Sequence, residues 1–439
     1  MHEAGVGVTL FYIAVVLLAA RLSSLVERFG QPAVLGEMLI GVVLGNLALA
    51  GLPFFEPIKQ SGVITFLADL GVVILLFQVG LESNIRDMRK VGMSAFLVAC
   101  VGVVLPMVFV TYVIGPLLLP DLSANAHLFL GAILTATSIG ITARVFRDLG
   151  VLQMREAQIV LGAAVIDDVL GLIILAVVSA IVTVGTVSAG DVLRIVGTAL
   201  AFLVSAVVIG QVFAGLLGRM FARVNTGQGM KLTMALSICL ISAYLAELVG
   251  LAPIVGAFAA GLVLDSVHFH PFARPRFVQD VQATTARIEP QAKAAVDEIL
   301  DRYTDRHIED LIEPLGAVMA PIFFVLTGMN VALASLLDPT FLLTALGITV
   351  VALISKIAAG FVAGNVNKWV VGWGMVPRGE VGLIFAATGL GLGVIDQRIF
   401  SMIVIVIMLT TLLTPPILAV VVRRGERRGM AVEAASAKA

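Results

Sequence analysis

The chain has 439 residues, of which 59% are hydrophobic and 13% charged, whereas an ordinary soluble domain has about 25% charged residues. This composition excludes a water-soluble globular protein and predicts an all-α polytopic membrane protein in contact with a lipid bilayer. The formal net charge is −1, and because no aromatic residues alternate with basic ones, we expect no nucleic acid partner.

Apolar segments recur along the whole chain, and we predict about thirteen transmembrane helices. A hydrocarbon core of about 30 Å needs about 20 apolar residues per helix. The first apolar segment has neither a preceding basic region nor a clear cleavage site, so we interpret it as a retained span. The predicted spans cover residues 9–25, 32–49, 62–80, 92–115, 126–146, 157–184, 192–218, 232–249, 252–265, 315–331, 341–363, 375–393 and 400–422.

Basic residues are concentrated in alternate loops between these spans. If the N-terminus lies outside, the basic segments 86–90, 144–155, 219–231 and 423–428 lie inside, and only Lys59, Arg194 and Arg398 lie outside. This is the imbalance that the positive-inside rule requires. We therefore expect a multi-pass protein of the cell (inner) membrane with a cytoplasmic C-terminus.

Residues 268–313 interrupt the apolar pattern with acidic and basic residues. We expect a cytoplasmic insert there, which is either an amphipathic helix along the membrane or a solvated connector. Only a short segment follows the last span, and nothing in the chain is typical of a nucleotide-binding unit. We therefore expect no cofactor and no regulatory cytoplasmic domain.

Two adjacent acids, Asp167 and Asp168, interrupt an otherwise apolar span. Asp168 lies thirteen residues after Arg155, or roughly 20 Å along a helix. Ionisable groups at such depth are costly and usually functional. The alternative is a protonated carboxylate that only bridges helices, but a tandem pair favours a functional site.

Lys356 is predicted at comparable depth, twelve residues before Lys368. A lone buried ammonium group would lose its proton or find a carboxylate, so we expect it to pair with one of the two aspartates. The alternative is a side chain that extends to the membrane interface.

Two spans carry signals for unwound helix, LTATSIG at 134–140 and AATGLGLG at 386–393. Discontinuous helices in transporters free carbonyl oxygens, which can bind a dehydrated cation together with hydroxyl groups such as those of Thr135, Thr137 and Ser138. The alternative is that these hydroxyls bond their own helix backbone.

A buried carboxylate that can bind either a proton or a monovalent cation suggests an exchange mechanism. A proton and a hard cation compete for the same carboxylate oxygens. If the site at Asp168 faces each side of the membrane in turn, that competition by itself couples the two fluxes.

Seven motifs together resemble the monovalent cation:proton antiporter-2 family, which includes NapA-type sodium/proton exchangers and Kef-type potassium efflux systems. They are QPAVLGEMLIGVVLGN at 31–46, FLADLGVVILLFQVGLES at 66–83, LTATSIGITARV at 134–145, AVIDDVLGLI at 164–173, GLAPIVGAFAAGLVL at 250–264, ISKIAAG at 354–360 and GMVPRGEVGLIFA at 374–386.

The resemblance implies a single membrane transporter domain over residues 1–439, with the inverted-repeat sodium/proton antiporter fold and two crossed discontinuous helices. It implies core, ion-translocating repeats at 92–184 and 341–422, and dimerisation or scaffold helices at 1–80 and 192–331. It also implies a homodimer.

The resemblance also assigns roles to single residues. Asp168 would bind the monovalent cation and the proton, Asp167 would pair with Lys356, and Thr135 to Ser138 would form the crossover backbone. Asp69 would line the approach to the site. Arg378 and Glu380 match the cytoplasmic start of the twelfth span and are interpreted as structural.

Kef-type systems have a glutamine before the aspartate and a large cytoplasmic domain, so the Asp-Asp pair favours sodium/proton antiport, and the pair with Lys356 favours electrogenic exchange. The alternatives are potassium/proton antiport, with lithium also open as a substrate, and an ion channel. An intramembrane aspartyl hydrolase is disfavoured because adjacent residues point about 100° apart on one helix. We therefore expect a transporter and not an enzyme.

Overall fold

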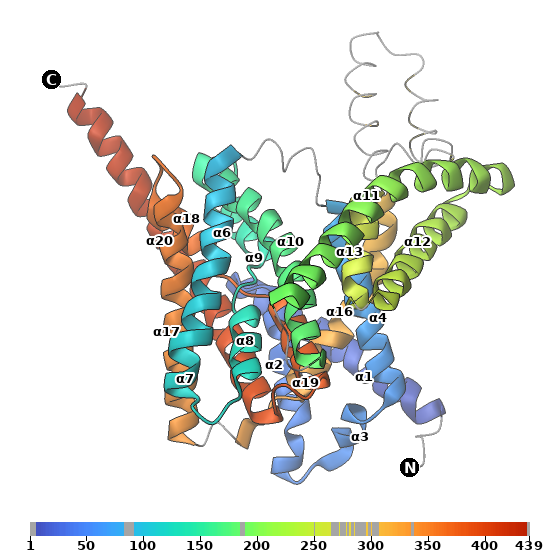
Figure 1. The fold of residues 1–439 in the computed structure, drawn as a ribbon, viewed down its shortest axis with the longest axis horizontal. Coiled ribbons are helices and arrows are strands. Elements are labelled where there is room, and N and C mark those ends of the chain that lie inside the picture. Colours follow the sequence, from blue (N-terminus) through green and yellow to red (C-terminus); the bar gives the residue numbers. More distant parts are fainter. Residues whose placement is uncertain are drawn as a thin grey trace. The chain divides into compact units, whose positions relative to one another are not determined.

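A computed structural model describes residues 6–82, 92–184, 189–249, 251–264, 307–334 and 338–436, and between 265 and 306 only six single positions. The described chain is helical almost throughout and contains no strand (Figure 1). This agrees with the prediction of an all-α protein.

Eight described helices, with their short continuations, are long and apolar enough to cross a membrane, judged by length and composition alone. They are α1 (Val6–Ser23), α4 (Gly62–Glu82), α6 (Gly92–Phe109), α10 (Arg155–Val184), α12 (Gln228–Leu248), α16 (His307–Met329), α17 (Pro339–Ala359) and α20 (Gln397–Ser436). The chain is thus a multi-pass membrane protein.

Further helices occupy the other five predicted spans. These are α2 (Ala33–Gly45), α8 (Ala124–Ile133) with α9 (Ile139–Asp148), α11 (Ala189–Val224), α13 (Pro253–Val263), and α19 (Glu380–Gly391), which follows α18 (Lys368–Gly374). Each of the thirteen predicted segments therefore overlaps at least one of the observed helices.

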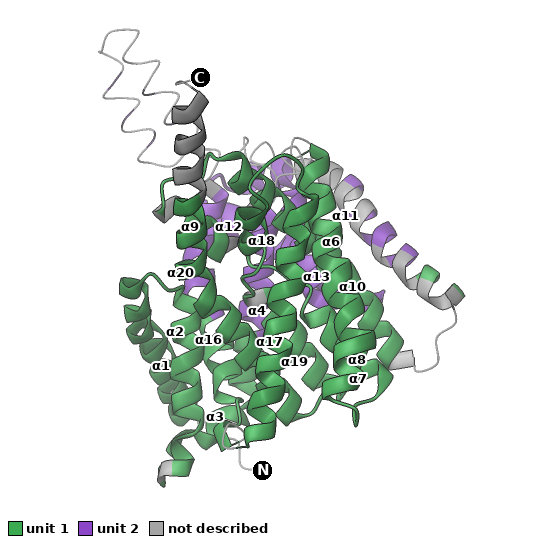
Figure 2. Ribbon diagram, turned by 90° about the vertical axis from the view of Figure 1, so that its left-hand side faces the viewer, with its two compact units in different colours: residues 1–68, 86–195, 321–439 green, residues 69–85, 196–320 purple. Residues whose placement is uncertain are grey.

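The chain divides into two compact units (Figure 2). The first comprises residues 1–68, 86–195 and 321–439, and the second residues 69–85 and 196–320. Both predicted core repeats, 92–184 and 341–422, belong to the first unit, together with the N-terminal helices. The assignment of the remaining helices to dimerisation stays a prediction.

Helices from both predicted repeats pack together within the first unit. α6 contacts α10 and α17, and α18 contacts α10 and α20. A shared apolar cluster joins their ends, with Ala99, Val160, Val371 and Leu418 among its buried members. Glycines bring α17 and α18 unusually close, because a Cβ at Gly372 would lie 2.5 Å from the carbonyl oxygen of Ile357.

The second unit has its own core, in which α12 packs against α13. Phe77, Cys239 and Ile312 are fully buried in it. Cys239 is a free thiol, as expected for a small apolar residue of a helix interior.

The helix that contains the predicted span 315–331 begins earlier than predicted. α16 begins at His307 and not near Leu315, so residues 307–313 form its first turns. Ile308 and Ile312 lie four residues apart, hence on one helix face, and both are buried in the core. An amphipathic helix was one of the two interpretations of the insert, and residues 307–313 are helical. Most of residues 265–306 lie outside the described residues.

Candidate functional site

α10 carries Asp167 and Asp168 well inside the helix, and both are buried, with exposed fractions of 1% and 4%. The helix forms because apolar residues surround the acids on both sides, from Ala157 to Val178. Two adjacent carboxyl groups that are buried in a membrane protein lose their solvation by water. An opposite charge or hydrogen bonds must offset that loss.

Lys356 of α17 supplies that compensation for one of the two acids. Its Nζ lies 3.1 Å from Oδ2 and 3.4 Å from Oδ1 of Asp167, and neither side chain is exposed to solvent. Asp168 also lies within electrostatic range of the ammonium group. The structure therefore gives each acid a different environment, with Asp167 in the direct ion pair.

The first helix break lies where the sequence predicted it. α8 ends at Ile133 and α9 begins at Ile139, which leaves residues 134–138 outside regular helix. Thr135 Oγ1 donates to the carbonyl of Ala132 at 2.7 Å, so this hydroxyl bonds its own backbone, as the alternative interpretation held. Thr137 and Ser138 instead face the other repeat.

The second break was predicted at the wrong place. Residues 386–391 continue α19 as regular helix, and the break lies earlier, at 375–379, between α18 and α19. The reason is Pro377, which has no N–H for the helix and disfavours the helical conformation of Val376 before it. The glycines after Ala386 accompany the end of α19.

The two breaks contact each other directly. The backbone N–H of Ser138 donates to the carbonyl of Pro377 at 2.8 Å, and Thr137 Oγ1 donates to the carbonyl of Met375 at 3.2 Å. The structure therefore contains two discontinuous helices that cross at their unwound segments.

Thr142 is a residue of the crossing that sequence reasoning missed. Its Oγ1 donates to the carbonyl of Gly374, the last residue of α18, at 2.8 Å. The same hydroxyl also donates to the carbonyl of Ser138, the residue before α9, at 3.2 Å. A threonine one turn after the break was the only available signal.

Arg378 was predicted at the cytoplasmic start of the twelfth span. The structure places it instead in the second break, where its side chain is fully buried. Its guanidinium donates to the carbonyls of Leu134 at 3.0 Å and Ala352 at 3.1 Å. Asp167 lies within electrostatic range. Because a guanidinium is permanently charged, Arg378 adds a fixed positive charge where α17 and both breaks meet.

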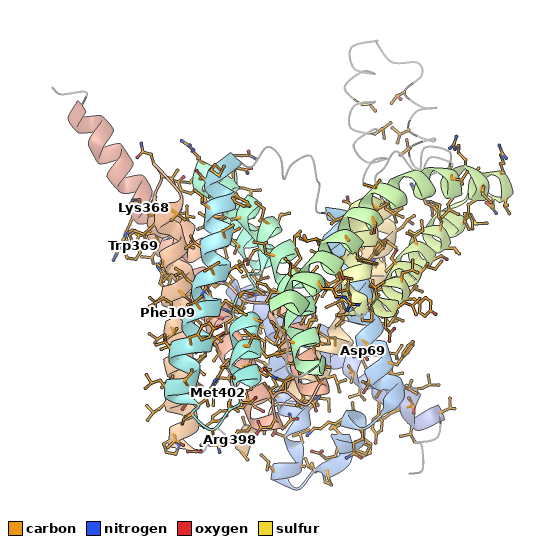
Figure 3. All side chains as sticks on the ribbon, in the orientation of Figure 1. Asp69, Phe109, Lys368, Trp369, Arg398 and Met402 are labelled. Carbon is orange, nitrogen blue, oxygen red and sulfur yellow. The ribbon has the colours of Figure 1, made fainter. Side chains whose placement is uncertain are left out.

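Two further residues were predicted from the sequence, Asp69 and Glu380. Asp69 is exposed on α4 and belongs to the second unit, and Figure 3 labels it there. Its role in access stays a prediction. Glu380 begins α19, but its side chain lies outside the described residues.

Among the described residues, no three His, Cys, Asp or Glu side chains gather as in a multidentate metal site. The donors available for a monovalent cation near the acids are of another kind: carboxylate oxygens, and hydroxyl and carbonyl oxygens of residues 134–138. Hard monovalent cations favour such oxygen ligands.

The model of the family described as "Sodium/hydrogen exchanger, transmembrane" matches residues 13–283 and 298–424. The chain belongs to this family. The exchanger is therefore a monovalent cation:proton antiporter by family, and its family is one of transporters.

Curated relatives agree over nearly the full length. The exchanger is 33% identical to the high-affinity Na⁺/H⁺ antiporter NhaS3 of Synechocystis sp., over 90% of this chain and 86% of the relative. It is also 33% identical to the Na⁺/H⁺-K⁺ antiporter GerN of Bacillus cereus, over 90% of this chain and 91% of that protein.

A solved structure shares the fold. The sodium proton antiporter MjNhaP1 of Methanocaldococcus jannaschii superimposes with a TM-score of 0.64 at 14% identity, covering 95% of this chain and 100% of that one. At this identity the likeness shows the antiporter fold alone.

Proposed function

We propose that the exchanger is a sodium/proton antiporter in which Asp168 binds the cation and the proton in turn. The observation that carries the proposal is the buried Asp168 beside the Asp167–Lys356 ion pair. α10 also packs on α9, α18 and α19, the helices on either side of the two breaks. The relatives supply the cation, since NhaS3 and GerN are both named as Na⁺/H⁺ antiporters.

Coupling follows from competition. The carboxylate of Asp168 holds either a proton or a dehydrated sodium ion on the same oxygens. An empty ionised carboxylate is costly to carry through an apolar barrier, so the site changes its access only when it is occupied. Each inward crossing with one ion then requires an outward crossing with the other.

The Asp167–Lys356 pair supports exchange of two protons for one sodium ion. In the proton-loaded state, neutral Asp168 and the ion pair carry no net charge. In the sodium-loaded state, two carboxylates, one Na⁺ and a neutral Lys356 carry one negative charge. The two states differ by one charge, because the Arg378 guanidinium stays charged in both. Transport is therefore electrogenic.

Alternating access is proposed to occur by an elevator-like movement of the core repeats, 92–184 and 341–422, against the remaining helices. The exchanger is proposed to work as a homodimer in the inner membrane, with the N-terminus outside and the C-terminus in the cytoplasm. The distribution of basic loops supports this orientation.

Purified exchanger in liposomes tests the function. With an imposed pH gradient and an internal pH dye, added sodium should release protons, and Asp168→Asn should abolish the signal. Asp121→Asn is the matched control, because Asp121 is an exposed acid in a turn. If sodium, lithium and potassium all fail to move protons, antiport is refuted. Full activity of Asp168→Asn would show that Asp168 is not part of the site.

Potassium/proton exchange is the second candidate. It is favoured by the relative GerN, which is named as a Na⁺/H⁺-K⁺ antiporter. The same liposomes should respond to sodium at lower concentration than to potassium. The reverse order of the half-maximal concentrations would make potassium the substrate.

A further inference from the structure

One end of the first unit carries an exposed aromatic pair. Phe361 follows α17, Trp369 lies in the first turn of α18, and their rings meet edge to face at 5.7 Å between centroids. Their exposed fractions are 51% and 54%. Aromatic rings at the ends of spans are typical of the membrane–water interface.

Lys368 adds a positive charge to this pair. Its Nζ lies 5.9 Å from the ring centroid of Phe361, and Figure 3 shows Lys368 and Trp369 together on the outer side of α18. In the described part of the chain, no ion pair involves Lys368. Arg398 at the start of α20 makes a similar contact with Phe341, but it is paired with Asp338.

Three more basic residues converge on the same end. Asn367 donates its backbone N–H to Glu156 Oε1 at 2.9 Å, which places Arg155 near the start of α18. Val422 shares a buried cluster with Val370, which brings the exposed residues Arg423 and Arg424 of α20 to this end as well.

An apolar strip leads away from the cluster along α17. Leu343, Leu346, Val350 and Ile354 are spaced by three or four residues and so share one helix face. Each is at least half exposed, with fractions from 50% to 69%. The strip has the length and character that a lipid acyl chain requires, whereas a soluble anion would gain nothing from it.

We propose that Phe361, Lys368, Trp369, Arg155, Arg423 and Arg424 form a binding site for the phosphate headgroup of an anionic phospholipid, whose acyl chain lies along the exposed face of α17. Basic residues at a membrane surface attract anionic headgroups. The aromatic pair holds the ammonium at the interface and covers the glycerol region.

Trp369 provides a direct reporter, because the chain has two tryptophans and Trp373→Phe leaves Trp369 alone. We would reconstitute this variant in phosphatidylcholine bilayers that contain a minor fraction of brominated phosphatidylglycerol or of brominated phosphatidylcholine. Bromine quenches only adjacent tryptophan. The anionic lipid should quench Trp369 more strongly than the zwitterionic lipid at the same fraction, and equal quenching would overturn the proposal.

Charge variants in the same background test the residues. Lys368→Gln should weaken the preference about fivefold, and the triple Lys368→Gln/Arg423→Gln/Arg424→Gln should abolish it, since each basic residue contributes independently. Lys368→Arg should keep the preference, and so should the control Arg398→Gln. A preference that survives in the triple variant, or that inorganic phosphate removes, would overturn the proposal. Because no transport is measured, the result stands apart from the proposed function.

Discussion

Lys356 and Asp167 are two opposite charges without solvent exposure, so each depends on the other. Removing one partner of such a pair leaves an uncompensated buried charge and lowers the free energy of unfolding by about 3–5 kcal/mol. Replacing both partners by uncharged side chains can leave that free energy nearly unchanged. We therefore expect Lys356→Gln to lower stability strongly and Asp167→Asn/Lys356→Gln to recover most of the loss. Thermal unfolding of the wild type, Asp167→Asn, Lys356→Gln and the double variant measures this coupling. Additive effects would show that the two groups do not interact.

The same double variant separates stability from transport. It should be folded yet deliver one proton fewer per sodium ion, because only Asp168 remains to titrate. Comparison of proton and sodium fluxes in one liposome preparation checks this expectation. An unchanged ratio would assign the second proton to another group.

Arg378 joins three segments through one planar group, since it donates to the carbonyls of Leu134 and Ala352 and also to Val376. A lysine keeps the charge but cannot reach these acceptors with a rigid fork. Hydrogen bonds of charged groups contribute about 1.5–3 kcal/mol each. We expect Arg378→Lys to lose at least one such bond and to unfold at lower temperature than the wild type. A melting temperature equal to that of the wild type would contradict this role.

At the scale of elements, α18 packs closely on α17 just before the second break, which begins at Met375. A Cβ at Gly372 would lie 2.5 Å from the carbonyl oxygen of Ile357, and one at Gly360 would lie 2.1 Å from that of Lys368. Gly372→Ala should therefore push α18 away, displace residues 375–379 and reduce both stability and transport.

Gly391→Ala is the matched control for this packing, because nothing lies within 4 Å of its added methyl group. It should gain about 0.5–1 kcal/mol from the lower backbone entropy of alanine in a helix. Melting temperatures and initial transport rates of both variants test the pair. Equal effects would mean that the close helix contact is unimportant.

The elements also show the limit of local patterns. The break at 134–138 was visible in the sequence because short hydroxyl residues and Gly140 cluster there. The second break was misplaced because glycine after Ala386 is as compatible with a helix end as with unwinding. Pro377 was the better signal, and its carbonyl accepts a hydrogen bond from the backbone N–H of Ser138, far away in the chain.

For the whole molecule, the proposed movement of one net charge per cycle would make transport depend on membrane potential. With two protons exchanged for one sodium ion, an inside-negative potential draws protons inward. We expect a potassium diffusion potential of that sign to accelerate sodium efflux from sodium-loaded liposomes, by an amount that follows about 2.3 kcal/mol per charge per 100 mV. A rate of sodium efflux that does not change with the membrane potential would show electroneutral exchange.

Hydropathy, charge distribution and the tandem acids are properties of short segments, and the sequence by itself therefore determined the membrane class, the helical segments and the two aspartates. It also implied that Lys356 needs an acid, because an unpaired buried charge is costly in any fold. The family resemblance implied that the acid is Asp167, and the tertiary structure shows the contact. Only the tertiary structure decided that Thr142 and Arg378 join the two crossed breaks, and that α16 begins at His307. These features depend on backbone carbonyls and helix faces from distant segments, whose positions are set by packing and carry no local pattern.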